Sequence, residues 1–151
     1  MSAGLQEEVF VFPGRIVMDY HYAMGGVGSR FLTELRDNQR IVGICCSECG
    51  RVYVPPRLTC ARCFRNMEHW VTLSGRGTLD SFTIVHYSEP HHPGPPPVAY
   101  GLIHLDGADT GFVHLLSEVD PGRLSIGRRV EPVFREKREG NILDIRYFRP
   151  I

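Results

Sequence analysis

The sequence lacks an excess of charge of either sign. Its 17 Lys and Arg residues balance its 17 Asp and Glu residues, and Lys137 is the single lysine among them. A nucleic-acid-binding domain normally shows a basic patch and a high isoelectric point. The balance therefore argues against a protein whose main ligand is a nucleic-acid backbone.

The sequence also lacks a long apolar run. No stretch approaches the roughly 20 apolar residues that cross a bilayer as a helix. The first residues show no cationic segment followed by an apolar run, so we expect neither a membrane span nor a secretory signal. The five cysteines are an odd number with a spacing that fits metal better than disulfides. A reducing cytoplasm is the expected location.

Strong helix signals are scarce, whereas turn-forming residues are common. The 16 Gly and 11 Pro residues favour short strands joined by turns, and 42% hydrophobic residues suffice for a core. We expect a mainly β protein with three parts. These are an N-terminal arm with a short helix (residues 1–40), a rubredoxin-like zinc ribbon (residues 41–70) and a five-stranded barrel (residues 71–151).

Four cysteines form the strongest chemical signal. Cys46 and Cys49 make one C-x-x-C pair, and Cys60 and Cys63 make a second pair ten residues later. Each pair can lie on a tight turn, and two such turns can surround one zinc ion with four thiolates. A site of this kind is closed, so it stabilises a fold and leaves no position for a substrate. Cys45 stands one residue before the first ligand, and its spacing to Cys49 is wrong for the turn.

The N-terminal zone predicts one short helix. Ser29 is a suitable N-cap for a helix that reaches about residue 38, and the preceding glycine run favours a flexible hinge. Phe31, Leu32 and Leu35 form the apolar face of this helix. So short a helix is marginal alone in water. Its apolar face must therefore dock either on a partner protein or on the later part of the same chain.

The C-terminal zone predicts five strands separated by short turns, at residues 77–87, 99–106, 111–119, 129–137 and 142–149. Pro132 marks its strand as an edge or a bulge, and Gly75 and Gly77 indicate a bend before a long first strand. Five short, coiled strands are typical of an OB-fold barrel.

These motifs together resemble a known family. The pattern combines the two cysteine pairs with Pro55-Pro56-Arg57 between them, and continues with residues 74–78, Ser-Gly-Arg-Gly-Thr. It is similar to the DUF35 family of small zinc-ribbon and OB-fold proteins that accompany thiolase-like enzymes, over about residues 29–137. Phe64 directly after Cys63 departs from the family pattern, because a small residue would ease the turn.

The resemblance implies an accessory role in acyl-CoA metabolism. Family members pair with thiolases, including one of anaerobic toluene degradation, with hydroxymethylglutaryl-CoA synthase, or with thiolase-like aldolases of steroid side-chain breakdown. The catalytic groups then belong to the thiolase-fold partner, and a hetero-oligomer such as a heterotetramer is expected. The small subunit supports the assembly and contributes to the route of the CoA ester.

Other residues allow further hypotheses. Arg57, Arg62 and Arg65 surround the second cysteine turn and could face the phosphates of CoA, although a solvated surface explains them equally well. His91 and His92 lie in a proline-rich connector that could border a ligand entrance. His86, His104 and His114 fall within predicted strands and show no carboxylate at a spacing that would orient them for catalysis.

An OB-fold protein that binds single-stranded nucleic acid is the alternative function. Such barrels stack bases on aromatic side chains and hold the backbone in a basic groove. The aromatic candidates in the predicted strands and loops are Tyr87, Tyr100, Phe112, Tyr147 and Phe148.

Overall fold

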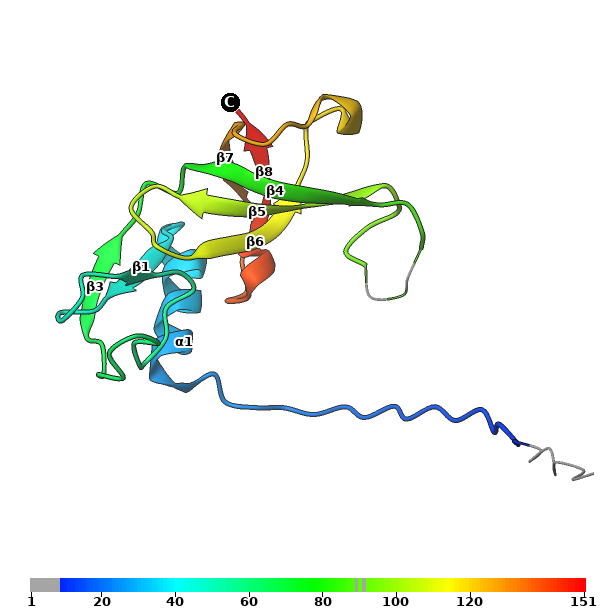
Figure 1. Ribbon diagram of the computed structural model, residues 1–151, viewed down its shortest axis with the longest axis horizontal. Coiled ribbons are helices and arrows are strands. Elements are labelled where there is room, and N and C mark those ends of the chain that lie inside the picture. The colour runs from blue at the N-terminus through cyan, green and yellow to red at the C-terminus, as the bar shows by residue number, and fades with distance from the viewer. Residues whose placement is uncertain (1–8, 89, 91) are drawn as a thin grey trace, which may run out of the picture.

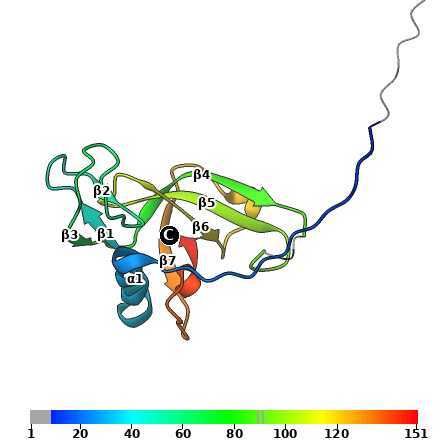
Figure 2. The ribbon, with the colours of Figure 1, turned by 90° about the horizontal axis from the view of Figure 1, so that it is seen from below.

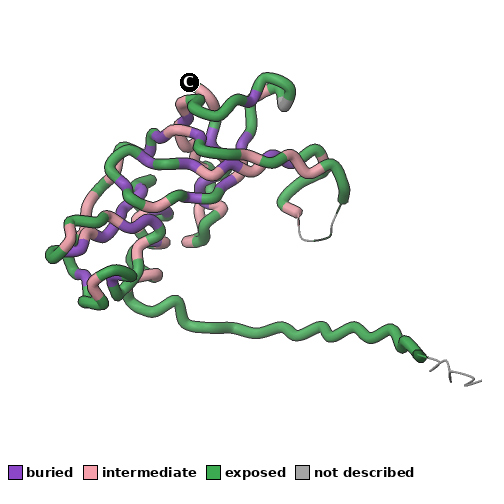
Figure 3. The backbone as a smooth tube through the Cα atoms, viewed as in Figure 1, coloured by how far each residue is buried: buried purple, intermediate pink, exposed green. Residues whose placement is uncertain are grey.

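A computed structural model describes residues 9–151 apart from residues 89 and 91, so His91 lies outside the described residues. Residues 9–24, which we call the arm, have no regular secondary structure, and every one of them is exposed. The arm runs away from the folded body as a single extended segment (Figures 1 and 2). Figure 3 shows that the buried residues lie in the body alone.

The expected zinc module folds as a three-stranded antiparallel sheet in the order β2-β1-β3. Its strands are β1 (Val42–Cys45), β2 (Val52–Tyr53) and β3 (His69–Thr72). The central strand pairs with β2 through Ile44 and Tyr53, and with β3 through Val42 and Thr72. β3 spans the expected boundary between residues 70 and 71, so the sheet continues directly into the barrel segment.

The C-terminal part is a closed barrel with the strand order β4-β5-β6-β8-β7. Its strands are β4 (Gly77–Val85), β5 (Val98–Leu105), β6 (Gly111–Leu116), β7 (Arg129–Phe134) and β8 (Ile145–Pro150). Two short 3-10 turns, η2 (Pro121–Arg123) and η3 (Ile142–Asp144), lie between the later strands. All pairs are antiparallel except β6 with β8. The predicted OB-fold barrel is confirmed.

Proline and glycine shape this barrel as expected. Pro132 lies in β7 next to a register shift between Val133 and Phe134. β4 is coiled by a second shift between Leu79 and Ser81. Gly77 begins β4 where a Cβ atom would lie 2.5 Å from the carbonyl oxygen of His104. Only glycine therefore allows β4 and β5 to approach so closely here.

The N-terminal helix starts earlier than predicted. α1 (Gly25–Thr33) continues into a π-helical turn, η1 (Glu34–Asn38), so the end near residue 38 is confirmed, whereas Ser29 is not the N-cap. The glycine run is the first turn of the helix rather than a flexible hinge. Met24 packs over Gly28, since a Cβ atom there would lie 3.2 Å from the Met24 Cβ. Tertiary packing thus outweighs the weak helix propensity of glycine.

The apolar face of this helix docks on the chain itself. Phe31 is 3% exposed and Leu35 is fully buried, and both belong to one core that also contains Ile41 of the ribbon segment and Leu79 of the barrel. Leu32 packs against the same core. Phe31, Leu32 and Leu35 were candidate partner-docking residues. Phe31 and Leu35 are buried in the chain's own core, whereas docking through the partly buried Leu32 stays a prediction. The helix, ribbon and barrel therefore share a continuous core.

Polar contacts also tie the ribbon to the barrel. The outer edge of β2 faces the turn between β5 and β6, where Val52 exchanges two 2.8 Å hydrogen bonds with Asp109. The Thr110 hydroxyl accepts from the Val54 N–H at 2.8 Å and donates to the Val54 carbonyl at 2.9 Å. The turn thus satisfies backbone groups that the edge of a small sheet would otherwise leave unpaired.

The contacts of the three histidines in the predicted strands, His86, His104 and His114, indicate what each side chain does in the fold. His114 is buried between Phe112 and Phe148, its Nδ1 accepts from the Leu115 N–H, and its Nε2 lies 3.2 Å from the Ile142 carbonyl. Burial lowers the pKa of His114, which favours the neutral ring. His104 contacts the Ala108 carbonyl, and His86 lies exposed just beyond β4. The surroundings of His86 and His114 match the expected surface or hydrogen-bonded roles, whereas the Asp80 carboxylate lies 3.6 Å from His104 Nδ1, a neighbour that the sequence did not indicate.

Thr110→Val tests the joint between ribbon and barrel. The variant leaves the N–H of the buried Val54 without its partner, so we expect a loss of about 1–3 kcal/mol in the free energy of unfolding. Thr110→Ser keeps the hydroxyl and should lose far less. Chemical denaturation of the zinc-loaded protein measures both, and equal stability of the two variants would contradict the assigned role of the hydroxyl.

Candidate metal centre

Two turns of the same construction carry the four cysteines. In the first turn, the Gly50 N–H donates to the Cys46 carbonyl at 2.8 Å and the Cys46 N–H donates to the Arg51 carbonyl. The second turn has the equivalent bonds: the Phe64 N–H donates to the Cys60 carbonyl, and the Cys60 N–H donates to the Arg65 carbonyl. Gly50 and Phe64 both have a positive φ, which closes each turn. Each C-x-x-C spacing therefore aims two sulfur atoms at the same side of its turn.

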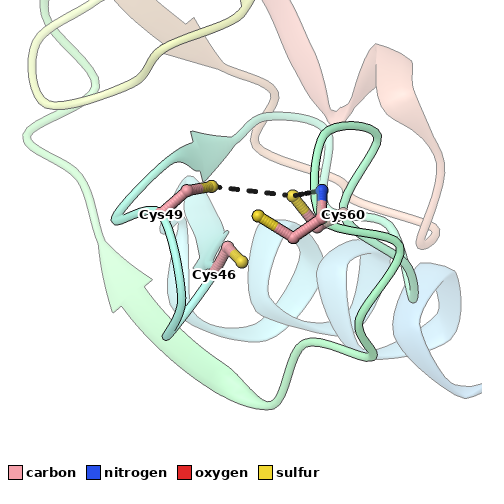
Figure 4. A group of neighbouring side chains, drawn as sticks. Cys46, Cys49 and Cys60 are labelled. Atoms are coloured by element: carbon pink, nitrogen blue, oxygen red, sulfur yellow. Dashed lines mark hydrogen bonds between the residues drawn. The ribbon is translucent and has the colours of Figure 1, made fainter.

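The turns face each other and bring the four sulfur atoms together. The Sγ atoms of Cys46, Cys49, Cys60 and Cys63 all lie within 4.8 Å of one another. The sulfur atoms of Cys49 and Cys60, which come from opposite turns (Figure 4), lie 3.7 Å apart. A tetrahedral zinc ion with Zn–S bonds of about 2.3 Å requires sulfur atoms about 3.8 Å apart. The cluster therefore fits a zinc ion with four thiolate ligands.

Cys60 has the most hydrogen-bond donors of the four. The N–H groups of Arg62 and Cys63 each lie 3.4 Å from its Sγ, and the hydroxyl of buried Tyr53 lies 3.3 Å away. The Tyr53 contact is the main cause that lowers the pKa of Cys60 to about 6. Cys63 shows the opposite effect, since its contact with Cys49 raises its pKa to about 12. Zinc binds the thiolate form of cysteine, so its binding displaces the protons that remain on the ligands.

Cys45 stands apart from the four ligands. Its Sγ is directed to backbone carbonyls, 3.4 Å from that of Gly50 and 3.7 Å from that of Cys46. The cluster contains Cys46 and not Cys45, in agreement with the predicted spacing. The side chain of Tyr53 was not identified from the sequence. An aromatic residue on a ribbon strand gave no sign that its hydroxyl would reach a cysteine seven positions away.

The arginines near the second turn are exposed. The Arg57 guanidinium lies 5.2 Å from the ring centroid of Tyr53, a cation–π contact that covers a residue next to the metal centre. Arg62 and Arg65 point into solvent on the same loop. A contact between these arginines and CoA phosphates stays a prediction. His92 lies beside Tyr87, with ring centroids 5.6 Å apart, in the connector between β4 and β5.

The barrel offers fewer stacking residues than the nucleic-acid hypothesis requires. Phe112 is 2% exposed and Phe148 is fully buried, so both rings belong to the core and cannot stack on bases. The Tyr147 hydroxyl donates to Glu118, which places a carboxylate on that side of the barrel. Only Tyr87 among the five candidates has a largely exposed ring.

Comparison with protein families agrees with this architecture. Residues 33–68 match the rubredoxin-like zinc ribbon domain of ChsH2, and residues 70–135 match the C-terminal OB-fold domain of ChsH2. The matched segments correspond to the cysteine turns and to the first four barrel strands. The four clustered cysteines lie within the first of them, so the metal is a structural zinc ion.

Two archaeal relatives match most of the chain. A DUF35 domain-containing scaffold protein of Methanocaldococcus jannaschii is 30% identical over 122 residues, which cover 78% of this chain and 86% of the relative. A protein of the same description from Pyrococcus furiosus is 32% identical over 128 residues, with coverage of 82% and 92%. The chain belongs to the DUF35 family.

Two solved structures share the fold. The Ltp2-ChsH2(DUF35) aldolase matches with a TM-score of 0.62 and 25% identity, covering 81% of this chain and 93% of the matched one. A DUF35-family protein of unknown function from Sulfolobus solfataricus gives the same score and identity, with coverage of 83% and 84%. Within the described residues, no helix combines the length and apolar character needed to cross a membrane.

A comparison of Cys46→Ser with Cys45→Ser tests which of these adjacent cysteines is the zinc ligand. Loss of one thiolate ligand removes binding energy that is also folding energy, so we expect Cys46→Ser to lose zinc and several kcal/mol of stability, on the order that structural zinc supplies. Cys45→Ser should keep one zinc per chain. Elemental analysis and thermal unfolding measure both, and the reverse pattern would show that Cys45 is the ligand.

Tyr53→Phe tests the hydroxyl contact to Cys60. Groups that hold a metal ligand in place typically change metal affinity 10- to 100-fold when removed. We therefore expect zinc release to a chelator to be about tenfold faster in this variant. Tyr147→Phe is the matched control, since it removes a hydrogen-bonded hydroxyl from the barrel. The same release rate in Tyr53→Phe and the natural protein would rule out a role for this hydroxyl in holding zinc.

Proposed function

We propose that this chain is a non-catalytic accessory subunit of a complex in which a thiolase-fold enzyme forms or breaks a carbon–carbon bond of an acyl-CoA ester. The observation that carries the proposal is the arm. The family relationship supports it, because the archaeal relatives are described as scaffold proteins.

The arm is an apolar segment that the chain itself leaves uncovered. Ten of its large apolar side chains are between 49% and 87% exposed, namely Val9, Phe10, Val11, Phe12, Ile16, Val17, Met18, Tyr20, Tyr22 and Met24. Soluble proteins rarely expose contiguous apolar surface of this kind unless it binds another molecule. The arm therefore replaces the helix face as the expected partner-docking segment of the N-terminal zone.

The first residues of the described arm suggest how it binds. Val9, Phe10, Val11 and Phe12 are β-branched or aromatic residues that favour extended structure, and Pro13 follows them. An extended peptide can add a strand to an exposed sheet edge of a partner, where alternate side chains enter pockets. We therefore propose that residues 9–12 pair with a sheet edge of the enzyme subunit.

The metal centre supports separate roles for the two subunits, with a structural role for this chain and a catalytic role for its partner. Four thiolates fill the coordination sphere of zinc and leave no position for water or substrate. Zinc thus stabilises this chain, and the proposed catalytic groups belong to the thiolase-fold partner. We further propose a hetero-oligomer such as a heterotetramer, in which this chain helps to shape the route of the CoA ester.

A thiolase-like aldolase is a second candidate for the partner. The structural match to the Ltp2-ChsH2(DUF35) aldolase favours it. A thiolase of anaerobic toluene degradation is the candidate that the sequence motifs favour. With either candidate partner, we propose that this chain forms a stable complex through the arm.

Removal of residues 1–22 tests the arm. We expect the shortened chain to stop co-eluting with a co-expressed thiolase-fold subunit, since the docking side chains are gone. Zinc content and melting temperature should stay unchanged, because the arm contributes no residue to either core. Size-exclusion chromatography of the purified proteins measures complex formation.

Phe10→Ser combined with Phe12→Ser in the full chain is the finer test, with Tyr87→Ser as a control at an exposed aromatic residue outside the arm. The arm variant should weaken the complex and the control should not. A complex that forms equally well without the arm would remove the main support for the proposal.

A further inference from the structure

The second cysteine turn has a backbone conformation that its sequence disfavours. Phe64 has a φ of +55°, in the left-handed region, whereas Gly50 holds the same place in the first turn with a φ of +70°. Glycine adopts this region freely, and for a bulky residue it is a genuine outlier. The two turns make the same backbone hydrogen bonds. A glycine at position 64 would therefore suit the turn better than phenylalanine does.

Packing within the chain does not compensate for this strain. The Phe64 side chain is 80% exposed, so it gains little from burial in its own fold. Leu58 lies on the same loop and is 57% exposed. Residues in disfavoured backbone conformations concentrate at functional sites, where the surroundings hold them in place. Here the surroundings are the zinc turn, which keeps the aromatic ring presented to solvent.

Three arginines share the loop with these two apolar side chains. The loop of residues 57–67, which we call the anchor loop, contains Arg57, Arg62 and Arg65 and no acidic residue. All three arginines are exposed, and within the described part of the chain none of them forms an ion pair with a carboxylate. Aromatic residues and arginine are the types most enriched at the energetic centres of protein interfaces.

We propose that the anchor loop is a second docking surface, in which Phe64 enters an apolar pocket of a partner protein and Arg62 and Arg65 face carboxylates at its rim. This proposal rests on the proposed function, since the partner is the enzyme subunit that also receives the arm. The loop is fixed by two cysteine ligands and by a hydrogen bond from the Met67 N–H to the Leu58 carbonyl. A ring held in position before binding loses little freedom on association.

The composition of the loop favours a protein over a nucleic acid. Single-stranded nucleic acid also uses aromatic stacking and arginine contacts. Leu58, however, offers no aromatic face for a base, and the whole chain has no net positive charge. An aliphatic and an aromatic side chain on one arginine-rich loop, Leu58 and Phe64, suit a hydrophobic pocket with an acidic rim.

Phe64→Gly separates the docking role from a role in folding. The variant relieves the strained backbone and deletes the ring. We expect the melting temperature of the free, zinc-loaded chain to rise by about 2–4 °C. The dissociation constant of the complex with a co-expressed thiolase-fold subunit should increase at least tenfold. Val113→Ala removes exposed apolar surface from β6 as the matched control and should change neither quantity. Arg62→Glu with Arg65→Glu should weaken the complex as well.

Each result decides for or against the proposal. A lower melting temperature in Phe64→Gly would overturn it, because the ring would then stabilise the chain's own fold. Unchanged affinity, in a complex that the natural chain forms, would overturn it and leave the proposed function intact. Failure of the natural chain to bind the enzyme subunit would contradict both. Binding of a single-stranded oligonucleotide that is lost in Phe64→Gly would replace the protein partner with a nucleic acid.

Discussion

The convergence of four thiolates on one metal ion is the interaction on which the rest of this structure depends. The buried cluster of the ribbon contains five residues, Ile44, Cys46, Tyr53, Cys60 and Met67, and two of these are ligands. So small a cluster cannot offset the conformational entropy of the loops it joins. Zinc supplies the missing free energy and thereby fixes β2, whose outer edge meets the barrel turn at Asp109 and Thr110.

Much of this arrangement could be predicted because its determinants are local. The C-x-x-C spacing alone specifies two turns, and the sulfur atoms lie where the spacing requires. Four of the five barrel strands begin within one residue of the predicted position, since turn residues mark where strands start. The fifth prediction began at Ile142 and included η3, whose cap is formed by the Asn141 side chain. Its alternating residues Leu143 and Ile145 could not distinguish a short helical turn from a strand.

Long-range contacts explain what the sequence could not predict. The conformational freedom of glycine predicted a hinge at residues 25–28. The burial of Phe31 and Leu35 in a core formed with distant residues instead extends the helix through this segment. Phe112 and Phe148 were candidate stacking residues for the nucleic-acid alternative, whereas barrel closure turns both rings inward. The contact of Tyr53 with Cys60 likewise depends on how two turns meet. In each case the partner is specified only by the tertiary fold.

The early start of α1 has a mechanical consequence. Because Gly26 and Gly28 are helical and Met24 packs on Gly28, rotation where the chain leaves the body is confined to Gly25, whose φ is +67°, and to the exposed residues before Met24. A tether with a swivel would let the two proteins rotate against each other after capture. Residues 13–23, which are exposed and have no regular structure, form such a swivel, so a partner that binds the far end of the arm limits how far away the zinc-bearing end of the body can lie and does not set its angle.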